Sequence, residues 1–126
     1  MPIDDDTKWL WSVGATYALE GMKTIVLING VAAISILTFA GNNKTHEVHL
    51  IYSLVSFGAG VLMGALTLLS AYLSQLHYGN AGTTSAKENS WQVGSNFHWL
   101  TYFCAFLGLL LFAVGIFFAA IGLNVE

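Results

Sequence analysis

Residues 9–40 of the chain read WLWSVGATYALEGMKTIVLINGVAAISILTFA, a stretch long and apolar enough to form a helix that crosses a membrane. Polar residues nonetheless recur along one side of it. At about 100° per residue they fall within roughly 140° of one another on a helical wheel. This polar stripe consists of Ser12, Thr16, Glu20, Lys23, Thr24, Ser35 and Thr38. Because lipid cannot solvate such a stripe, it must face protein or an aqueous cavity.

Two apolar residues, Leu27 and Val31, lie on the same side between two polar groups. The order along the helix is therefore charged, apolar and hydroxyl-bearing, as in a pore with a hydrophobic constriction. The alternative interpretation is that Glu20 and Lys23 pair locally at the headgroup level, while the hydroxyls bond to carbonyls of their own helix. The predicted pore-lining residues are Glu20, Lys23, Thr24, Leu27, Val31, Ser35 and Thr38.

The composition of the 126-residue chain is typical of a membrane protein. Hydrophobic residues make up 56% of it and charged residues only 9%. Seven acidic residues against four lysines give a net charge of −3, and there is no arginine. Any anion must therefore be held by lysine, backbone or polar side chains, without a bidentate guanidinium. The single cysteine, Cys104, lies in an apolar run and is interpreted as a buried hydrophobic residue.

Three apolar segments are long enough to cross a bilayer core, which needs roughly 20 helical residues. They cover residues 22–40, 50–73 and 99–123, with loops expected at 41–49 and 77–96. We therefore predict an all-α integral membrane protein, with a single domain of three transmembrane helices over residues 1–126. The helical pattern continues past the membrane at one end, back to Thr7, forward to His77 and from about residue 85. Asp6 or Thr7 is expected to cap the first helix.

The few charged residues predict an orientation. Lys8, Lys23 and Lys87 fall on the side of the N-terminus and the second loop, and only Lys44 falls on the other side. The positive-inside rule therefore places the N-terminus in the cytoplasm and the C-terminus outside it. All four tryptophans lie on the cytoplasmic side, where they would form an interfacial belt. The first residues are acidic, unlike a cleavable signal sequence, so we expect the first span to be retained.

Small residues recur at helix-packing intervals in the second and third spans. In the second span, Gly60 and Gly64 form a GxxxG element within a stripe of serines, and in the third span glycines are seven residues apart. Small residues at these spacings let helix backbones approach closely. Alternatively, the hydroxyl-rich side of the second span lines a cavity and the first helix packs outside it. The predicted helix-packing residues are Asn29, Ser56, Gly60, Gly64, Gly108, Gly115, Ala119 and Gly122.

Asn29 lies near mid-bilayer on a different face from the polar stripe. An amide there needs a partner, and a hydrogen bond to another helix is favoured over ion coordination. The small-residue sides of the second and third spans are more packing surface than one three-helix chain needs. We therefore expect the chain to form a homo-oligomer, with closed cyclic symmetry as the common arrangement.

The chain shows no catalytic signature. No Ser-His-Asp, CxxC, P-loop or paired-carboxylate pattern is present, so we predict neither an enzyme nor a cofactor. His46 and His49 are three residues apart, but with only Glu47 beside them they fall short of a metal site. His77 and His98 flank the second loop, and solvation at the membrane surface is expected for all four histidines.

The segment Leu27-Ile28-Asn29-Gly30-Val31-Ala32-Ala33, followed by an aliphatic run ending in Phe39-Ala40-Gly41, resembles a pattern in small three-helix inner-membrane proteins of bacteria. The layout of the whole chain is similar to the channel-type effectors of anti-phage defence systems of the Hailong type. In those systems a nucleotidyltransferase partner makes an oligodeoxyadenylate that controls an oligomeric membrane channel. The resemblance implies a bacterial inner-membrane protein with a cytoplasmic nucleotidyltransferase partner or an oligonucleotide ligand.

Lysines and tryptophans on the cytoplasmic side offer a way to hold such a ligand, since aromatic stacking and positive charge together bind single-stranded nucleic acid. Two hypotheses of function follow. One is an oligomeric channel that depolarises the membrane when a cytoplasmic ligand or partner opens it. The other is an accessory subunit of a larger membrane complex, without a pore. A holin-like lysis protein ranks third, because the usual basic cytoplasmic tail is absent. The predicted ligand-binding residues are Lys8, Trp9, Trp11, Lys87 and Trp91.

Overall fold

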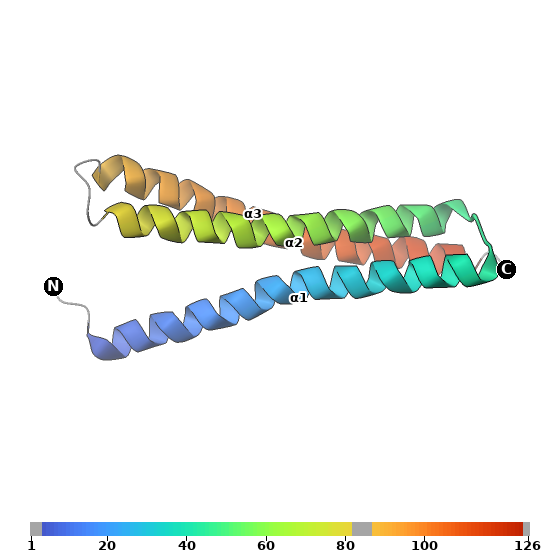
Figure 1. The fold of residues 1–126 in the computed structure, drawn as a ribbon, viewed down its shortest axis with the longest axis horizontal. Coiled ribbons are helices and arrows are strands. Elements are labelled where there is room, and N and C mark those ends of the chain that lie inside the picture. The colour runs from blue at the N-terminus through green and yellow to red at the C-terminus, as the bar shows by residue number, and fades with distance from the viewer. Residues whose placement is uncertain (1–3, 82–86, 125–126) are drawn as a thin grey trace.

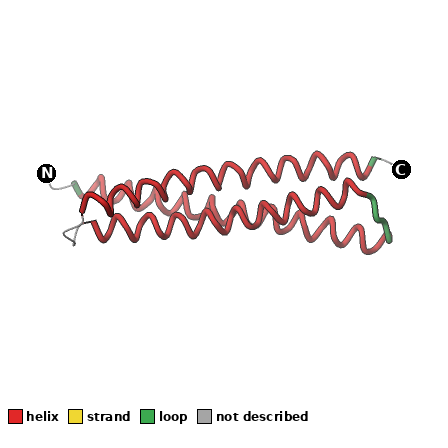
Figure 2. The backbone as a smooth tube through the Cα atoms, turned by 90° about the horizontal axis from the view of Figure 1, so that it is seen from above, coloured by secondary structure: helices red, strands yellow, loops and turns green. Residues whose placement is uncertain are grey.

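Three long antiparallel helices make up the structure. The computed structural model describes residues 4–81 and 87–124, with α1 at Asp5–Asn43, α2 at Val48–Ala81 and α3 at Lys87–Leu123. The helices run along one axis, so that α1 begins and α3 ends at opposite ends of the bundle (Figures 1 and 2). Each helix contains a stretch long and apolar enough to cross a membrane. The prediction of an all-helical chain with three such helices is confirmed.

Both connections are shorter than predicted. Because α1 runs to Asn43 and α2 begins at Val48, the first turn contains residues 44–47 in place of the predicted 41–49. Most of the predicted second loop, residues 77–96, is helical, since α2 continues to Ala81 and α3 begins at Lys87. The two loop predictions were therefore wrong in extent, and residues 82–86 lie outside the described part of the chain.

Contacts between α2 and α3 explain why this Gly- and Ser-rich segment is helical. Ser74 Oγ donates a hydrogen bond to the Gly94 carbonyl at 2.8 Å. A Cβ on Gly94 would lie 2.9 Å from the ring of Tyr78, so only glycine fits there without a shift. The rings of His77 and Phe97 stack with their centroids 5.8 Å apart. Tertiary packing thus overrides the weak helix propensity of these residues.

The first helix begins earlier than predicted. α1 starts at Asp5 with Asp4 in the N-cap position, so the predicted cap at Asp6 or Thr7 is wrong. Asp5 and Asp6 occupy the first turn, where negative charge suits the positive end of the helix dipole. At its other end α1 closes on Lys44, which adopts the left-handed conformation at φ 50°.

Glu47 fixes the start of α2. Its Oε2 accepts hydrogen bonds from the backbone N–H groups of His49 at 2.6 Å and Leu50 at 3.1 Å. Its Oε1 lies 2.7 Å from His49 Nδ1. A carboxylate that satisfies two free N–H groups of a first turn stabilises the helix start and fixes the direction in which α2 leaves the turn.

Small residues line the contact between α2 and α3. On α3 a series of buried small residues recurs at seven-residue intervals, and two of them, Gly94 and Thr101, extend the predicted packing residues toward the start of the helix. Ala119 is half-buried beside this series. The buried series on α3 is Gly94, Thr101, Gly108, Gly115 and Gly122. The small residues predicted on one side of α2 are also all buried: Ser53, Ser56, Gly60, Gly64, Thr67, Ser70 and Ser74.

The glycine carbonyls of α3 accept hydrogen bonds from the neighbouring helices. Ser53 Oγ donates to the Gly115 carbonyl at 2.8 Å, and Asn29 Nδ2 donates to the Gly108 carbonyl at 3.3 Å. Glycine has no side chain to shield its carbonyl. The glycines at seven-residue intervals on α3 therefore allow close helix packing and also supply hydrogen-bond acceptors. Where no water is present, such bonds satisfy polar groups that would otherwise oppose helix association.

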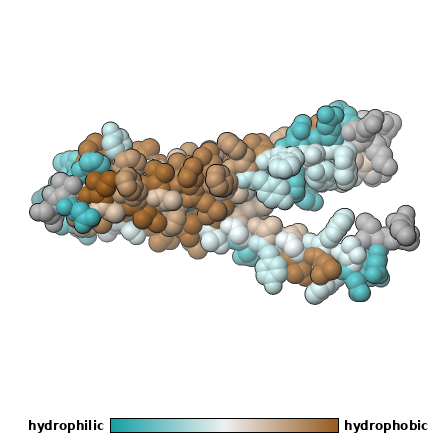
Figure 3. Space-filling model, turned by 180° about the vertical axis from the view of Figure 1, so that it is seen from behind, coloured by the Kyte–Doolittle hydropathy of each residue, from teal (hydrophilic) through white to brown (hydrophobic). Residues whose placement is uncertain are grey.

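α1 packs against the other helices through only part of its length. Ile25 and Asn29 are its buried residues, and a Cβ on Gly64 of α2 would lie 2.6 Å from Val26 Cγ2. Toward its N-terminus α1 diverges from the α2–α3 pair (Figure 1). Hydrophobic side chains gather over the packed part of the bundle, and the diverging ends are of intermediate to hydrophilic character apart from a hydrophobic patch on the α1 arm (Figure 3). A bilayer core of about 30 Å would match the packed part.

Gly115→Ala should lower the free energy of unfolding by about 1–3 kcal/mol, because the added Cβ would overpack the seam. It would lie 2.7 Å from Phe57 Cδ1, and Phe57 is only 2% exposed. Gly58→Ala is the matched control, since nothing lies within 4 Å of a Cβ at that position. Thermal unfolding in detergent measures both variants. Equal midpoints for the two variants would contradict the packing described for Gly115.

The pKa of Glu47 lies below its ordinary value of 4.5. The hydrogen bond from the His49 side chain is the largest cause, desolvation opposes it, and the backbone N–H groups of Leu50 and His49 add to it. A lowered pKa in the folded state means that Glu47 stabilises the fold above its ordinary pKa, and that this contribution disappears as pH falls through the lowered value.

Thermal unfolding of the wild type and of Glu47→Gln between about pH 7 and about pH 3 tests this linkage. The wild type should be the more stable near neutral pH, and the difference should shrink on acidification. A difference that stays constant over the whole range would show that the carboxylate does not act as the cap.

Candidate functional site

The polar stripe lies on the side of α1 that points away from α2 and α3. Ile25 and Asn29, the buried residues of α1, lie on the opposite side of the helix. Leu27 is 64% exposed and Val31 56% exposed. The structure thus brings the predicted pore-lining residues onto one outer surface of the chain. The exposed residues of this surface are Ser12, Thr16, Glu20, Lys23, Thr24, Leu27, Val31, Ser35 and Thr38.

Polar groups of the stripe find partners on α1 itself. Lys23 Nζ lies 2.9 Å from Glu20 Oε1 in an exposed ion pair. Thr24 Oγ1 donates to the Glu20 carbonyl, and Ser35 Oγ to the Val31 carbonyl, both at 2.8 Å. These are the local contacts of the alternative interpretation. They satisfy the donors of the hydroxyls, but they leave the hydroxyl oxygens and the ion pair on an outward surface.

The stripe crosses the level at which α1 leaves the bundle. At 1.5 Å per residue, α1 from Asn43 back to Met22 spans about 30 Å, the thickness of a bilayer core. Glu20 and Lys23 therefore lie at the edge of this zone, and the stripe from Thr24 onward lies within it. The charges would meet headgroups or water, whereas the hydroxyls face whatever surrounds the packed part of the bundle.

Asn29 joins all three helices. Its side chain is fully buried, and Nδ2 donates to the Ile25 carbonyl at 2.9 Å as well as to Gly108 of α3. Its Oδ1 accepts no hydrogen bond from the described residues and faces Gly60 of α2, where a Cβ would collide with the amide. Such an approach suits a weak Cα–H···O contact. Asn29 therefore lies where the sequence predicted an inter-helix contact.

The hydroxyl-rich side of α2 is occupied by packing. Ser53 and Ser74 donate to α3, Gly60 and Gly64 lie against α1, and Ser56 is buried. The alternative in which this side lines a cavity, with α1 packed outside it, does not fit the arrangement of the chain. The outward surface of α1 is the remaining polar surface along the apolar part of the bundle.

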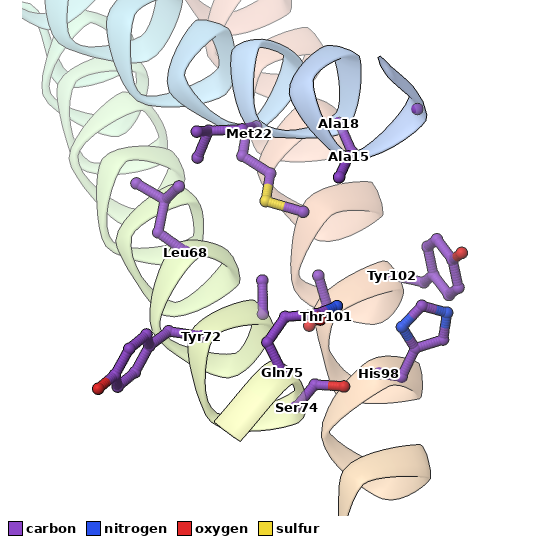
Figure 4. A pocket seen from close by; sticks show the side chains of 13 residues that line it. Ala15, Ala18, Met22, Leu68, Tyr72, Ser74, Gln75, His98, Thr101 and Tyr102 are labelled. Carbon is purple, nitrogen blue, oxygen red and sulfur yellow. The ribbon is translucent and has the colours of Figure 1, made fainter. Parts of the chain in front are cut away.

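A cavity of about 510 Å³ opens where α1 diverges from the other helices (Figure 4). Ala15, Ala18 and Met22 of α1 point into it from one side. Sequence reasoning missed this cavity, because it depends on the angle between helices and not on any motif. The facing wall consists of Leu68, Ala71, Tyr72, Ser74, Gln75, His98, Thr101 and Tyr102.

The predicted ligand-binding residues are spread over two helices at the diverging end. Trp9 and Trp11 on α1 are 63% and 67% exposed, and Lys8 Nζ lies 3.1 Å from Asp5 Oδ1. On α3, Trp91 is 62% exposed and packs against Tyr78, with the ring centroids 4.8 Å apart. The side chain of Lys87, which begins α3, lies outside the described residues. The structure does not bring the predicted ligand-binding residues of α1 together with Trp91 of α3 within one chain.

The histidines make aromatic and local contacts. His49 pairs with Glu47, His77 stacks on Phe97, and the ring centroid of His98 lies 4.7 Å from that of Tyr102. Within residues 4–81 and 87–124, no group of three or more His, Cys, Asp or Glu side chains is placed to hold a metal ion. Cys104 is buried at 4% exposure.

Comparison of the chain with protein-family models, with curated protein sequences and with solved structures gives no significant match.

Asn29→Ala should lower the free energy of unfolding by about 1–2 kcal/mol, because it removes the bond to Gly108 and leaves a void where the helices meet. Ser35→Ala is the matched control, since its hydroxyl bonds only within α1 on the outer surface. Thermal unfolding in detergent compares the two. If Asn29→Ala is no more damaging than Ser35→Ala, the amide does not hold α1 in place.

Proposed function

We propose that the protein is an integral membrane protein that assembles into a cyclic homo-oligomer, in which the α1 helices line an ion-conducting pore. The observation that carries the proposal is the outward polar stripe on α1. A lone chain in a membrane would turn this stripe toward lipid, where polar groups are costly. Placing the stripes of several copies around a common axis would turn them toward water.

The exposed surfaces of α2 and α3 support an assembly in which the polar stripe of α1 faces the pore. Large apolar side chains cover the outer sides of α2 and α3, as in Leu62 at 64%, Phe106 at 67% and Phe117 at 62% exposure. Those sides suit lipid, whereas the stripe does not. An assembly that keeps α2 and α3 outside and α1 inside satisfies both surfaces, and identical copies achieve it by closed rotational symmetry.

The apolar residues within the stripe supply a constriction. Leu27 and Val31 repeat around the axis of such an assembly and form two adjacent apolar rings. Apolar rings can block ions by dewetting, while Thr24 and Ser35 on either side suit a wetter lumen. Glu20 and Lys23 would then lie at the cytoplasmic mouth, where an ion pair on each copy sets the local field.

The cellular location of the protein and the ligand that opens the pore are also part of the proposal. We place the protein in a bacterial inner membrane, with the N-terminus in the cytoplasm, so that the diverging ends face a cytoplasmic ligand or partner. Binding of an oligonucleotide, or of a nucleotidyltransferase partner, through Lys8, Trp9, Trp11, Lys87 and Trp91 stays a prediction. Symmetry would repeat these residues around the pore mouth, which compensates for their separation within one chain.

The same stripe also suits a second candidate function. Another membrane protein would cover the stripe as well as further copies of this chain would, which makes this protein an accessory subunit. The mass of the purified particle separates the two candidates. A multiple of the chain mass supports the channel, and stoichiometric capture of a different large membrane protein supports the subunit.

Leu27→Ser should increase ion leak through liposomes that contain the purified protein, because a hydroxyl ring would let water enter the constriction. The matched control is Leu62→Ser on α2, since both leucines are 64% exposed. Flux of a fluorescent ion reporter measures the leak at equal protein content. Equal flux from the two variants, or no flux above protein-free liposomes, would refute the pore.

A further inference from the structure

The inner face of α1 continues past the point where the helix leaves the bundle. Ala15, Ala18, Met22, Ile25 and Asn29 recur at alternating three- and four-residue intervals and fall within roughly 80° on a helical wheel. Ile25 and Asn29 are buried against α2 and α3, whereas Ala15 and Ala18 are exposed. A face built for helix packing is thus used in one part of α1 and unused in the other.

We propose that the N-terminal half of α1 swings onto α2 and α3 and closes the cavity, and that the structure holds the open position. The closing surfaces are the Ala15–Ala18–Met22 face of α1 and the cavity wall formed by Leu68, Ala71 and Gln75 of α2 and Thr101 of α3. The proposal concerns a movement within one chain. Its role as a gate rests on the proposed channel function.

The register of the packed part predicts which residues meet. A Cβ on Gly60 meets Asn29, and a Cβ on Gly64 meets Val26 and Ile25. In this antiparallel pairing each step back along α1 is one step forward along α2. Continued through the cavity, the pairing brings Met22 to Leu68, Ala18 to Ala71 and Gly14 to Gln75, all of which line the cavity.

The two surfaces also match in size. Gly14 would lie opposite the larger Gln75, and Ala18 and Ala71 are both small, so that the helices can approach closely. Closure would also remove the apolar side chains of Ala15, Ala18, Met22, Leu68 and Ala71 from water.

Gly21 gives α1 a place to bend. It lies just before the first packed turn, and nothing lies within 4 Å of a Cβ built on it. A glycine inside a helix weakens the helix by about 1 kcal/mol relative to alanine, which makes it a common site of bending. The side-chain hydrogen bonds of this half run within α1, as in Thr16 Oγ1 to the Ser12 carbonyl at 3.0 Å, so they survive the swing.

Closure has a direct consequence for the pore. Glu20 lies on the opposite side of α1 from Ala18 and Met22, and Lys23 is about 100° or more from both on the helical wheel. When the inner face moves toward α2 and α3, the charged pair withdraws from the axis of the oligomer. The cytoplasmic mouth of the pore therefore widens as the cavity closes, and a ligand at the diverging ends could select either position.

Disulfide trapping tests the movement. In a Cys104→Ala background, which removes the only native thiol, the pair Ala18→Cys/Ala71→Cys is oxidised in liposomes. The pair Gly30→Cys/Val61→Cys is the positive control, because a Cβ on Gly30 lies 3.9 Å from Val61 Cγ2. Thr16→Cys/Ala71→Cys is the negative control, since Thr16 lies on the stripe. Mass spectrometry of the digested monomer band measures the disulfide formed within one chain.

We expect the 18/71 pair to form a disulfide within the chain, more slowly than the 30/61 pair, and the 16/71 pair to form none. No 18/71 bond under conditions that oxidise the 30/61 pair would overturn the proposal, as would an 18/71 bond found only between two chains. Ion flux is recorded on the same samples. An 18/71 bond in protein that conducts nothing would refute the channel and retain the closure.

Discussion

The close approach of α1 to Gly60 and Gly64 of α2 and Gly108 of α3 is the contact on which the arrangement depends. Asn29 fits only because Gly60 on α2 has no side chain, and its amide nitrogen reaches the carbonyl of Gly108 on α3. The α2–α3 pair is packed along its whole length, whereas α1 is packed over only part of its length, and both of its buried residues, Ile25 and Asn29, lie in this region. The contacts of these two residues set which side of α1 faces α2 and α3.

Two features of the chain follow from this orientation of α1. With Ile25 and Asn29 turned inward, the polar stripe points outward. Its donors are satisfied within α1, but its exposed oxygens and ion pair suit further copies, another protein or water better than lipid. With the same inner face continuing through Ala18, the diverging half of α1 keeps a surface that fits the cavity wall. In the proposed channel, a helix that is packed at one end and free at the other would transmit a change at its diverging end to the pore when both positions are populated.

The sequence was sufficient for features that repeat along a helix. Apolar length predicted the three helices, and small-residue spacing indicated the buried sides of α2 and α3. It failed where tertiary contacts decide the outcome. The Gly- and Ser-rich segment 77–96 was predicted as a loop with a helical pattern from about residue 85, whereas α2 continues to Ala81 and α3 begins at Lys87, and Ser74 and Tyr78 pack on Gly94 of α3. The cavity could not be predicted from the sequence either, because the angle at which α1 diverges depends on tertiary packing and produces no local sequence pattern.

In the proposed channel, the outer surface of α1 faces water inside the membrane. Labelling of single cysteines with a membrane-impermeant thiol reagent in intact vesicles tests it most directly, in a Cys104→Ala background. Ser35→Cys on the stripe should react, while Leu62→Cys and Phe106→Cys, on exposed apolar sides of α2 and α3, should not. If Ser35→Cys stays as unreactive as these two while His46→Cys in the first turn is labelled, the stripe faces lipid or protein and the account is wrong.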